Sequence, residues 1–340
     1  RALALRAAPG ARGAWDAMGA PTNVLAPMVD QSGLAFRLLA RRYGAELCYT
    51  PMLHAAVGTG DGGAQYLARH FQTCAGDAPL IAQFAGHDPP TVARAAAATL
   101  ELAGPHADNV VGLDVNLGCP QQIARRGGYG AYLLERDIAA AAAVVRRLRA
   151  DLGDERIISC KVRLLPDDDA ALTNTNVAVA RLVDAGCGLL CVHGRTRIQN
   201  KHLSGAPSWP AVAALRAAVP PDVVVIANGG VADAETAAAA LAVTGADAVM
   251  SGEGLLANPA LFCGNRDPEA GAFVDARRLA REYLELAEAT NAHPGDARGH
   301  IFKMLHGGLS SLPGARDALA AASSLEAVRR VVASLDAADP

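Results

Sequence analysis

The sequence predicts an α/β fold, a (β/α)8 TIM barrel followed by a small C-terminal helical domain. From Thr22 onward, short apolar or β-branched runs alternate with alanine-rich helical stretches, which is typical of a parallel sheet covered by helices. The apolar runs number about eight, the number of strands that closes such a barrel. After Ala260 the strand pattern stops, which predicts that the chain ends in helices. The same alternation leaves an open, doubly wound sheet as an alternative.

Each strand is predicted from a run of apolar and β-branched residues, and each helix from an alanine-rich stretch between two such runs. The strands are expected at residues 23–28, 46–49, 80–84, 112–117, 157–162, 189–192, 223–227 and 248–251. The helices are expected at residues 34–43, 90–102, 137–148, 177–185, 210–219 and 234–243. Several helices are expected to end at a glycine, such as Gly44 or Gly245.

The two ends of the chain differ from the predicted barrel. Residues 273–290, 298–311 and 325–335 have the periodicity of amphipathic helices. Residues 1–20 are rich in alanine, arginine and glycine, which is typical of a disordered tail or the remnant of a targeting peptide. We therefore expect a tail over residues 1–20, a catalytic barrel over 21–267 and a helical RNA-binding domain over 268–340.

Composition limits the classes of function. The chain of 340 residues has a net charge of −3, so a nucleic-acid partner must be held by a local basic patch. Its seven cysteines do not have the spacing of a disulfide scaffold or of zinc ligands, which predicts reduced thiols and no metal site. We expect a cytoplasmic protein, with a nuclear or organellar location left open. No apolar stretch is long enough to span a bilayer, so no membrane contact is expected.

The most informative segment is NLGCPQ at residues 116–121, which follows an apolar run that predicts a buried strand. It places the Cys119 thiol in a rigid loop at the carboxyl end of that strand, where α/β folds keep their reactive groups. Pro120 restricts the backbone after the thiol, and the glycines at residues 127–130 let a ligand approach the main chain. A cysteine is more often a small buried hydrophobic residue, but this loop favours a chemical role.

Polar residues follow other predicted strands as well. The carboxyl ends of the strands carry the active site in barrels of this kind. Taken singly, His193 is compatible with an ordinary core histidine, and Lys161 with a side chain that extends from the rim of the barrel into solvent. Polar residues at so many strand ends are hard to explain by packing. The candidates at these ends are Asp30, Gln83, Asn116, Lys161, Arg163, His193, Asn228 and Glu253.

Glycines follow the last two predicted strands, in NGG at residues 228–230 and SGEG at residues 251–254. Loops at these positions commonly hold a phosphate on backbone N–H groups. A ligand with a phosphate tail and a polar ring is expected, and flavin mononucleotide (FMN) fits that description. GTGDGG at residues 58–63 matches the G-x-G-x-x-G dinucleotide pattern, but it does not directly follow a strand, so we interpret it as a flexible loop.

Three groups of basic residues are candidates for binding RNA. Each group alone is more typical of a solvated surface. Their positions after predicted strands or in the helical domain favour a surface around the mouth of the barrel. They comprise Arg125 and Arg126; Arg195, Arg197, Lys201 and His202; and Arg298, His300, Lys303 and His306.

Together these motifs resemble the tRNA-dihydrouridine synthase family over roughly residues 24–262, with a weaker similarity in the helical tail. The segments that carry the resemblance are APMVD at residues 26–30, NLGCPQ at 116–121 and VHGRT at 192–196. Two further segments, PMVDQS at 27–32 and LCYTPMLH at 47–54, resemble the eukaryotic branch that modifies uridines 16 and 17.

The resemblance implies an FMN enzyme that reduces the C5=C6 bond of a uridine in tRNA, with NADPH or NADH as reductant. It implies that Cys119 is the acid that protonates C5. Many members have an arginine at the position of Glu253, so backbone amides of residues 252–254 or another arginine would hold the phosphate here. The positions that contact FMN in the family are here Pro27, Met28, Val29, Gln83, Lys161, His193, Asn228, Gly229, Gly230, Gly252 and Glu253. The expected contacts to tRNA are Asn116, Arg163, Arg125, Arg126, Arg195, Arg197, Lys201, His300 and Lys303.

Two other functions stay open, and no obligatory protein partner is expected for any of them. An FMN barrel of the dihydroorotate- or enone-reductase type would act on a small soluble substrate and would not need a basic helical tail. A flavin-free RNA-binding protein with this fold would not need Cys119, Lys161 and His193 together.

Overall fold

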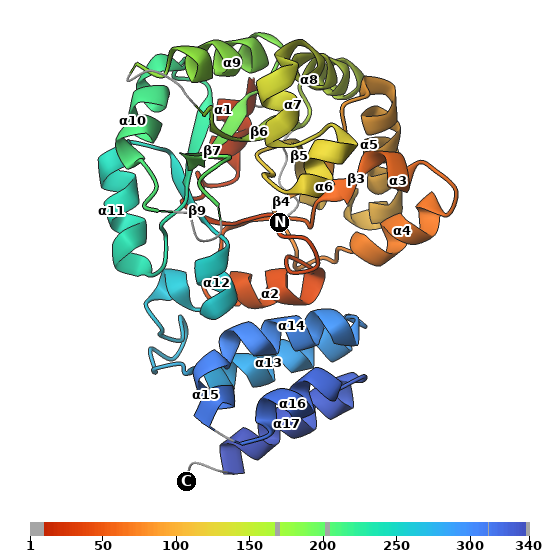
Figure 1. Ribbon diagram of the computed structural model, residues 1–340, viewed down its shortest axis with the longest axis vertical. Helices are drawn as coiled ribbons and strands as arrows, with labels where there is room; N and C mark the ends of the chain where they lie inside the picture. Colours follow the sequence, from red (N-terminus) through yellow and green to blue (C-terminus); the bar gives the residue numbers. More distant parts are fainter. Residues whose placement is uncertain (1–9, 167–170, 201–204, 312, 338–340) are drawn as a thin grey trace.

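The predicted strands form a parallel sheet that closes on itself (Figure 1). The computed structural model describes residues 10–166, 171–200, 205–311 and 313–337. Within these residues the strands pair in the order β2-β1-β9-β8-β7-β6-β5-β4, and β2 also pairs with β4, which closes the ring. This closure confirms the (β/α)8 barrel and excludes the open sheet. The strands of the ring are β1 (Asn23–Leu25), β2 (Leu47–Tyr49), β4 (Leu80–Ala85), β5 (Val110–Leu117), β6 (Ile157–Leu164), β7 (Leu189–Thr196), β8 (Val224–Asn228) and β9 (Ala248–Ser251), and the short β3 (Leu53–His54) pairs with β4 beyond β2.

Helices cover the outside of the barrel, close to their predicted ranges (Figure 1). Four of them begin at a polar residue whose side chain accepts a hydrogen bond from the backbone N–H three residues later, which satisfies a free donor at the helix start. Gly245 ends one helix with a φ of +59°, a conformation that favours glycine. The main helices are α2 (Leu34–Arg42), α5 (Pro89–Ala103), α8 (Ile138–Leu152), α9 (Thr173–Asp184), α10 (Trp209–Ala218) and α11 (Ala234–Thr244).

The glycine-rich segment at residues 58–63 contains the expected loop, a short run of turns and a bend at residues 59–62. It joins two helices, α3 (Ala55–Gly58) and α4 (Gly63–His70). A Cβ atom at Gly63 would lie 2.4 Å from the carbonyl oxygen of Gly58. The glycines therefore allow two short helices to pack at a tight turn, which explains the pattern without a nucleotide.

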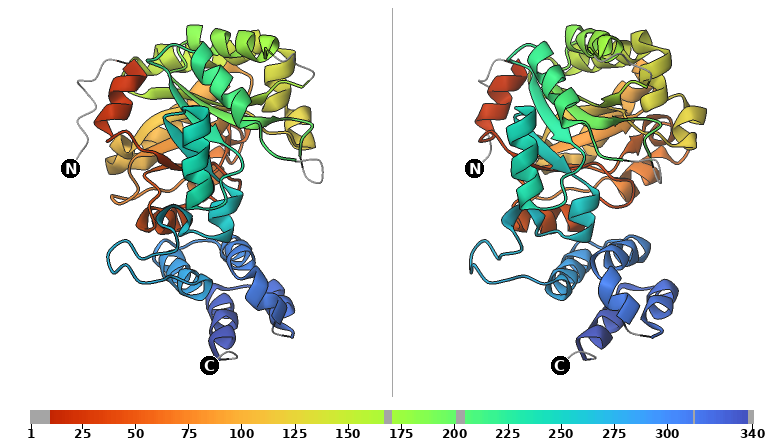
Figure 2. Two further views of the ribbon diagram at one scale, coloured as in Figure 1. Left: turned by 90° about the vertical axis from the view of Figure 1, so that its left-hand side faces the viewer. Right: turned by 60° about the vertical axis from the view of Figure 1, so that its left-hand side comes forward.

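Helix α1 (Gly10–Ala17) closes the N-terminal end of the barrel and lies at one side in Figure 2. Trp15 is 1 % exposed and packs in one cluster with residues at or near the start of several strands, including Val24 and Val224. Arg12 forms an ion pair with Asp247 at 2.8 Å. The prediction of a disordered tail is therefore wrong for this helix, because one tryptophan and one arginine anchor it to the barrel. The rest of the predicted tail before Gly10 lies outside the described residues.

The C-terminal helices form a lobe next to α2 and α12 (Glu253–Ala257) (Figures 1 and 2). Ion pairs join the lobe to the barrel, Arg42 to Glu282 at 2.8 Å and Arg69 to Asp296 at 2.9 Å. Among the described helices of the chain, none is long and apolar enough to cross a membrane. The lobe comprises α13 (Ala276–Ala289), α14 (Pro294–Met304), α15 (His306–Ser311), α16 (Ala315–Ala321) and α17 (Leu325–Ala337), of which α16 was not predicted.

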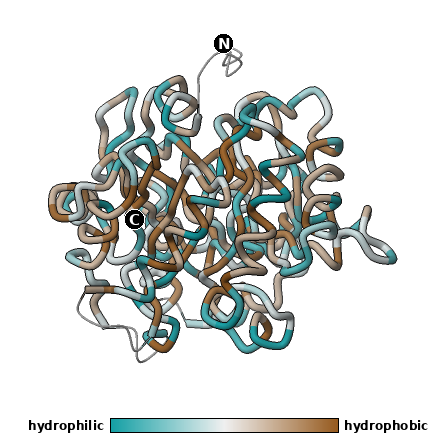
Figure 3. The backbone as a smooth tube through the Cα atoms, turned by 90° about the horizontal axis from the view of Figure 1, so that it is seen from above, coloured by the Kyte–Doolittle hydropathy of each residue, from teal (hydrophilic) through white to brown (hydrophobic). Residues whose placement is uncertain are grey.

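Polarity inside the barrel increases toward the carboxyl ends of the strands. Ile157, Ser159, Lys161 and Arg163 occupy alternate positions of β6 and face the interior, while the residues between them pack beneath the helices. Seen from above, hydrophobic segments are concentrated in the middle of the molecule (Figure 3). The apolar layer at the N-terminal end supports the barrel, and the polar layers above it leave side chains available for chemistry.

Candidate active site

The predicted site residues come together at the carboxyl ends of the strands. Strand register places Asn116 beside Lys161, Arg163 beside His193, and His193 beside Asn228. Because inward positions alternate along each strand, these side chains face the upper interior of the barrel. The residues brought together in this way are Gln83, Asn116, Lys161, Arg163, His193 and Asn228, with Cys119 just beyond the end of β5.

Asn116 holds the loop that carries Cys119. Its Oδ1 accepts hydrogen bonds from the backbone N–H groups of Gly118 at 3.1 Å and of Cys119 at 3.0 Å. Gly130, with a φ of +68°, lies against the same loop, and a Cβ there would be 2.9 Å from the Cβ of Cys119. After Cys119 the chain forms α6 (Gln122–Gly127) and then folds back, so that Gly130 lies beside Cys119. Only glycine can occupy this position without a clash.

The Cys119 thiol is half-buried and packs against a cluster that includes Tyr129 and Tyr132. Burial raises its pKa, and a backbone hydrogen bond and the nearby Arg163 and Lys161 charges oppose only part of this effect. Arg163 itself donates from Nε to the carbonyl oxygen of Gly118 at 2.9 Å and so braces the loop. A thiol with a raised pKa keeps its proton at neutral pH, which suits proton donation better than nucleophilic attack.

Positive charge accumulates near the thiol loop, on Lys161, Arg163 and Arg195. Lys161 donates from Nζ to Oδ1 of Asn228 at 2.9 Å, and burial lowers its pKa. Burial, followed by the charge of Arg195, lowers the pKa of Arg163 to about 10. Burial and then the Lys161 and Arg163 charges lower the pKa of His193, whose ring is therefore neutral. Such a cluster favours an anionic or electron-rich ligand.

The loops after β8 and β9 are shaped by glycine. Gly229 and Gly230 have φ values of +105° and +80°, and a Cβ at Gly229 would lie 2.8 Å from Cδ2 of His193. At Gly252, a Cβ would lie 3.3 Å from both the Cβ of Ala26 and the Sδ of Met28. Glycine therefore lets these two loops pack directly against His193 and the loop after β1, and the loops form a cradle whose backbone carries no side chains at these positions. This cradle, next to an amide and a lysine, fits the phosphate and the polar ring of FMN.

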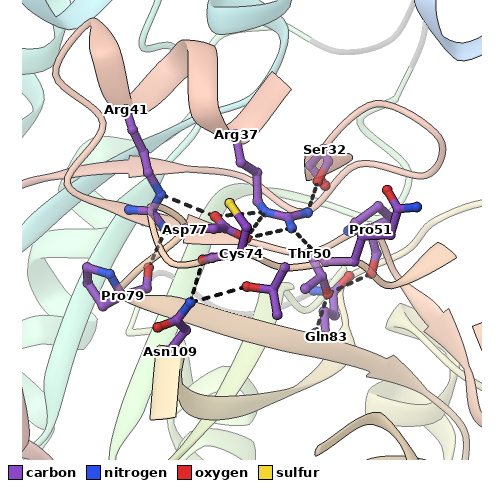
Figure 4. Close-up of polar contacts among 12 residues, drawn as sticks. Ser32, Arg37, Arg41, Thr50, Pro51, Cys74, Asp77, Pro79, Gln83 and Asn109 are labelled. Carbon is purple, nitrogen blue, oxygen red and sulfur yellow. Dashed lines mark hydrogen bonds and ion pairs between the residues drawn. The ribbon is translucent and has the colours of Figure 1, made fainter. Parts of the chain in front are cut away.

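A buried ion pair supports the loop after β1, residues 27–29 (Figure 4). Nη2 of Arg37 lies 2.7 Å from Oδ2 of Asp77, with side chains 1 % and 0 % exposed. Arg37 also donates from Nη1 to the carbonyl oxygen of Ser32 at 2.7 Å, and Oγ of Ser32 accepts from the backbone N–H of Met28 at 3.0 Å. Sequence reasoning missed this support because the two charged residues are far apart in the chain.

Asp114 is a second residue that the sequence reasoning missed. It is fully buried in β5, and its two carboxylate oxygens accept hydrogen bonds from Nε2 of Gln83 at 2.8 Å and Oγ of Ser159 at 2.5 Å. Burial raises its pKa to about 6. An acidic residue inside an apolar run that predicts a buried strand is the signal that would have identified it.

Glu253 turns its side chain away from the glycine loops. The side chain is 88 % exposed, and its Oε2 lies 3.2 Å from Nζ of Lys303 on α14. A negative charge is thus directed toward the helical lobe instead of toward a phosphate. The pair also means that Lys303, expected to be an RNA contact, is already partly neutralised.

The cations expected to bind RNA differ in their exposure and in their partners. Arg125 and Arg126 are exposed on α6, and no ion-pair partner for them is found in the described part of the chain. Arg197 is paired with Glu135 at 2.8 Å. Arg195 donates from Nη1 to Nε2 of His193 at 3.1 Å, and Lys201 lies outside the described residues.

The prediction that His300 contacts RNA is wrong. The residue is 1 % exposed, and its ring stacks on Phe36 with 4.3 Å between ring centroids and lies 4.7 Å from the ring of Tyr283. Burial lowers its pKa to about 3, so the ring is neutral. It acts as an aromatic residue in the contact between α2 and the lobe, because the packed face of α14 carries it.

Comparison with known proteins identifies the family. A family model described as dihydrouridine synthase (Dus) matches residues 24–327. The chain belongs to the dihydrouridine synthase family. Proteins named tRNA-dihydrouridine(16/17) synthase [NAD(P)(+)]-like from Rattus norvegicus and Mus musculus are each 39 % identical over 94 % of this chain, which spans 68 % and 62 % of their lengths. A tRNA-dihydrouridine(16/17) synthase from Schizosaccharomyces pombe is 34 % identical over 86 % of this chain and 71 % of its own length.

Solved structures support the fold alone. A complex of 2-naphthoyl-CoA reductase with 2-naphthoyl-CoA has a TM-score of 0.53 at 11 % identity, covering 71 % of this chain and 49 % of that one. Family membership confirms the predicted family and the predicted class of enzyme, a flavin-dependent oxidoreductase. Within the residues that the structure describes, no group of His, Cys, Asp or Glu side chains could hold a metal ion.

Proposed function

We propose that this protein reduces the C5=C6 bond of uridine in tRNA to 5,6-dihydrouridine, with FMN as cofactor and NADPH or NADH as reductant. The observation that carries the proposal is the half-buried Cys119 thiol, held by Asn116 at the mouth of a barrel whose upper interior collects Lys161, His193 and Asn228. Relatives named for positions 16 and 17 of tRNA favour those uridines as the target.

In this proposal, the residues at the strand ends hold the cofactor. Lys161 and Asn228, which are already hydrogen-bonded to each other, would offer a cation and an amide to the polar ring of FMN, and Gln83 and neutral His193 would offer further hydrogen-bonding groups. Backbone groups of residues 27–29, 228–230 and 252–254 would hold its phosphate and ring. Bound FMN would supply the hydride that reaches C6 of uracil.

Cys119 donates the proton that C5 requires once negative charge develops on the base. Its raised pKa keeps the thiol protonated until that charge forms. Asn116 and Arg163 position the loop, and the Arg163 and Lys161 charges stabilise the developing charge at O4 of uracil. The uridine must leave the base stack of the tRNA to reach this site.

We further propose that tRNA docks on the mouth of the barrel and on the helical domain, residues 268–340. Arg125, Arg126 and Arg195 are the cations on the barrel side, and Lys303 is the cation on the lobe. No obligatory protein subunit is required in this arrangement. Seven free cysteines favour a reducing compartment such as the cytoplasm.

The test uses the purified chain alone. The chromophore released on denaturation is identified by mass, and unmodified tRNA is incubated with the protein and NADPH before dihydrouridine is mapped by position. FMN and new dihydrouridine at positions 16 and 17 are expected. Recovery of a different flavin, or reduction of small enones with no reduction of tRNA, would refute the proposal and favour a small-substrate reductase.

A further inference from the structure

A continuous chain of hydrogen bonds runs from the middle of the barrel to the thiol loop. Nε2 of Gln83 donates to Oδ2 of Asp114 at 2.8 Å, and Nδ2 of Asn116 donates to Oε1 of Gln83 at 3.0 Å. Oδ1 of Asn116 then accepts from the backbone N–H of Cys119 at 3.0 Å. Two carboxamides thus connect a buried carboxylate to the loop that carries the proposed acid.

The two ends of this chain determine the direction of both amides. An ionised carboxylate only accepts hydrogen bonds, so the NH2 group of Gln83 must face Asp114. A backbone N–H only donates, so the carbonyl oxygen of Asn116 must face Cys119. The remaining groups, Oε1 of Gln83 and Nδ2 of Asn116, are then complementary to each other. If either amide turned over, two donors or two acceptors would face each other in a buried site.

Asp114 is not explained by packing. It is fully buried, and burial raises the pKa of its carboxyl, so its ionised form is unfavourable for the fold. Its second oxygen accepts from Ser159, whose Oγ lies 3.2 Å from the hydroxyl of Tyr49. This second branch leads away from Cys119, which makes Ser159 a suitable control.

We propose that Asp114 is a positioning residue whose carboxylate sets the orientation of Gln83 and, through Gln83 and Asn116, the conformation of the Cys119 loop. Gln83 is oriented toward the proposed cofactor site by the same contact. The inference rests on the proposed function for the chemistry that this loop performs, while the orientation itself follows from the hydrogen bonds.

The experiment compares Asp114→Ala, Asp114→Asn and Ser159→Ala with the wild type. Alkylation of Cys119 by iodoacetamide is followed by peptide mass spectrometry, together with the visible spectrum of the bound flavin. Asp114→Ala leaves Gln83 free to turn, so alkylation should rise about fivefold, the effect of losing one buried hydrogen bond, and the flavin spectrum should shift. Uridine reduction should fall in kcat while the KM for tRNA stays the same.

Asp114→Asn and Ser159→Ala test whether the rise in alkylation comes from losing the acceptor for Gln83. Asp114→Asn keeps an acceptor for Gln83 and can donate to Ser159, so alkylation should stay within about twofold of the wild type. Ser159→Ala removes a hydrogen bond from the same carboxylate on the side away from Gln83 and should also stay within about twofold. An equal rise in Ser159→Ala, or no rise in Asp114→Ala, would overturn the proposal.

Thermal unfolding of each variant shows whether it folds, and a further variant is available if Asp114→Ala does not. If Asp114→Ala does not fold, Gln83→Leu removes the partner of Asn116 while it keeps the carboxylate, and it should raise Cys119 alkylation in the same way. Unchanged alkylation in Gln83→Leu would refute the relay. Because alkylation needs neither tRNA nor turnover, a wild type that does not reduce tRNA would refute the proposed function and leave this comparison valid.

Discussion

Replacing Cys119 by alanine should separate two activities of the enzyme. The loop depends on the backbone N–H of Cys119, which donates to Asn116 at 3.0 Å, and on the packing of Gly130 beside Cys119, where a Cβ on Gly130 would lie 2.9 Å from the Cβ of Cys119. Alanine keeps both of these features and removes only the sulfur. The flavin site and the oxidation of NADPH by oxygen should therefore be unchanged. Uridine reduction should slow by about 10² to 10⁴, the usual contribution of a general acid.

The pH dependence gives a second measure of the same role. Burial raises the pKa of the Cys119 thiol, so the acid form predominates through neutral pH and is lost only in the alkaline range above the ordinary value of 9. Single-turnover reduction of tRNA should therefore decline at high pH, because the proton donor is lost as the thiol ionises. The oxidation of NADPH should lack this decline.

The assay combines stopped-flow oxidation of the reduced flavin by tRNA with steady-state NADPH oxidation, measured between pH 6 and 10. Cys119→Ala should lose the alkaline decline together with most of the rate. Reduction of tRNA by Cys119→Ala at the wild-type rate would show that another group donates the proton. An equal loss of both activities would show that the cysteine maintains the site and does not act as the acid.

Three further outcomes are expected. Trp15→Ala should lower the free energy of unfolding by about 3–5 kcal/mol in urea titrations, because it removes a 1 % exposed side chain from the base of the barrel; a change near zero would mean that α1 does not seal it. Arg125→Ala and Arg126→Ala should each lower the slope of log Kd for tRNA against log salt by about one while NADPH oxidation is unchanged, and an unaltered slope would place tRNA elsewhere. Lys303→Ala should weaken tRNA binding in anisotropy titrations whereas Glu253→Ala should strengthen it, because the carboxylate lies 3.2 Å from the ammonium group; changes of the same sign would contradict this arrangement.

Local patterns predicted most of the barrel. The predicted strand at residues 248–251 coincides with β9, and the predicted helix at 234–243 is one residue shorter than α11. Such elements depend on the periodicity of neighbouring residues and on caps a few residues away. Helix α1 was missed because its stability comes from Trp15 and Arg12 contacting the barrel, and composition alone describes the segment as a tail.

The site residues that lie within a motif were also predicted. Cys119 lies just beyond the carboxyl end of its strand, and Lys161 and His193 lie in the carboxyl-terminal halves of theirs; any closed barrel brings such positions together. Their roles remain proposals. His300 was assigned incorrectly because a basic residue in an amphipathic helix looks the same in sequence whether it faces solvent or, as here, an aromatic core.

Residues close together in the chain are enough to predict the alternation of strands and helices, the number of strands in the barrel, and the residues near the strand ends. These depend on interactions between residues close in the chain and on the symmetry of a closed sheet. The hydrogen bond from Gln83 to Asp114, the ion pair of Arg37 with Asp77, and the pairing of Glu253 with Lys303 become visible only in the folded chain. Each of these contacts joins segments that are far apart in the chain. Its energy depends on how deeply the groups are buried and how they are oriented, and neither property can be predicted from a local sequence pattern.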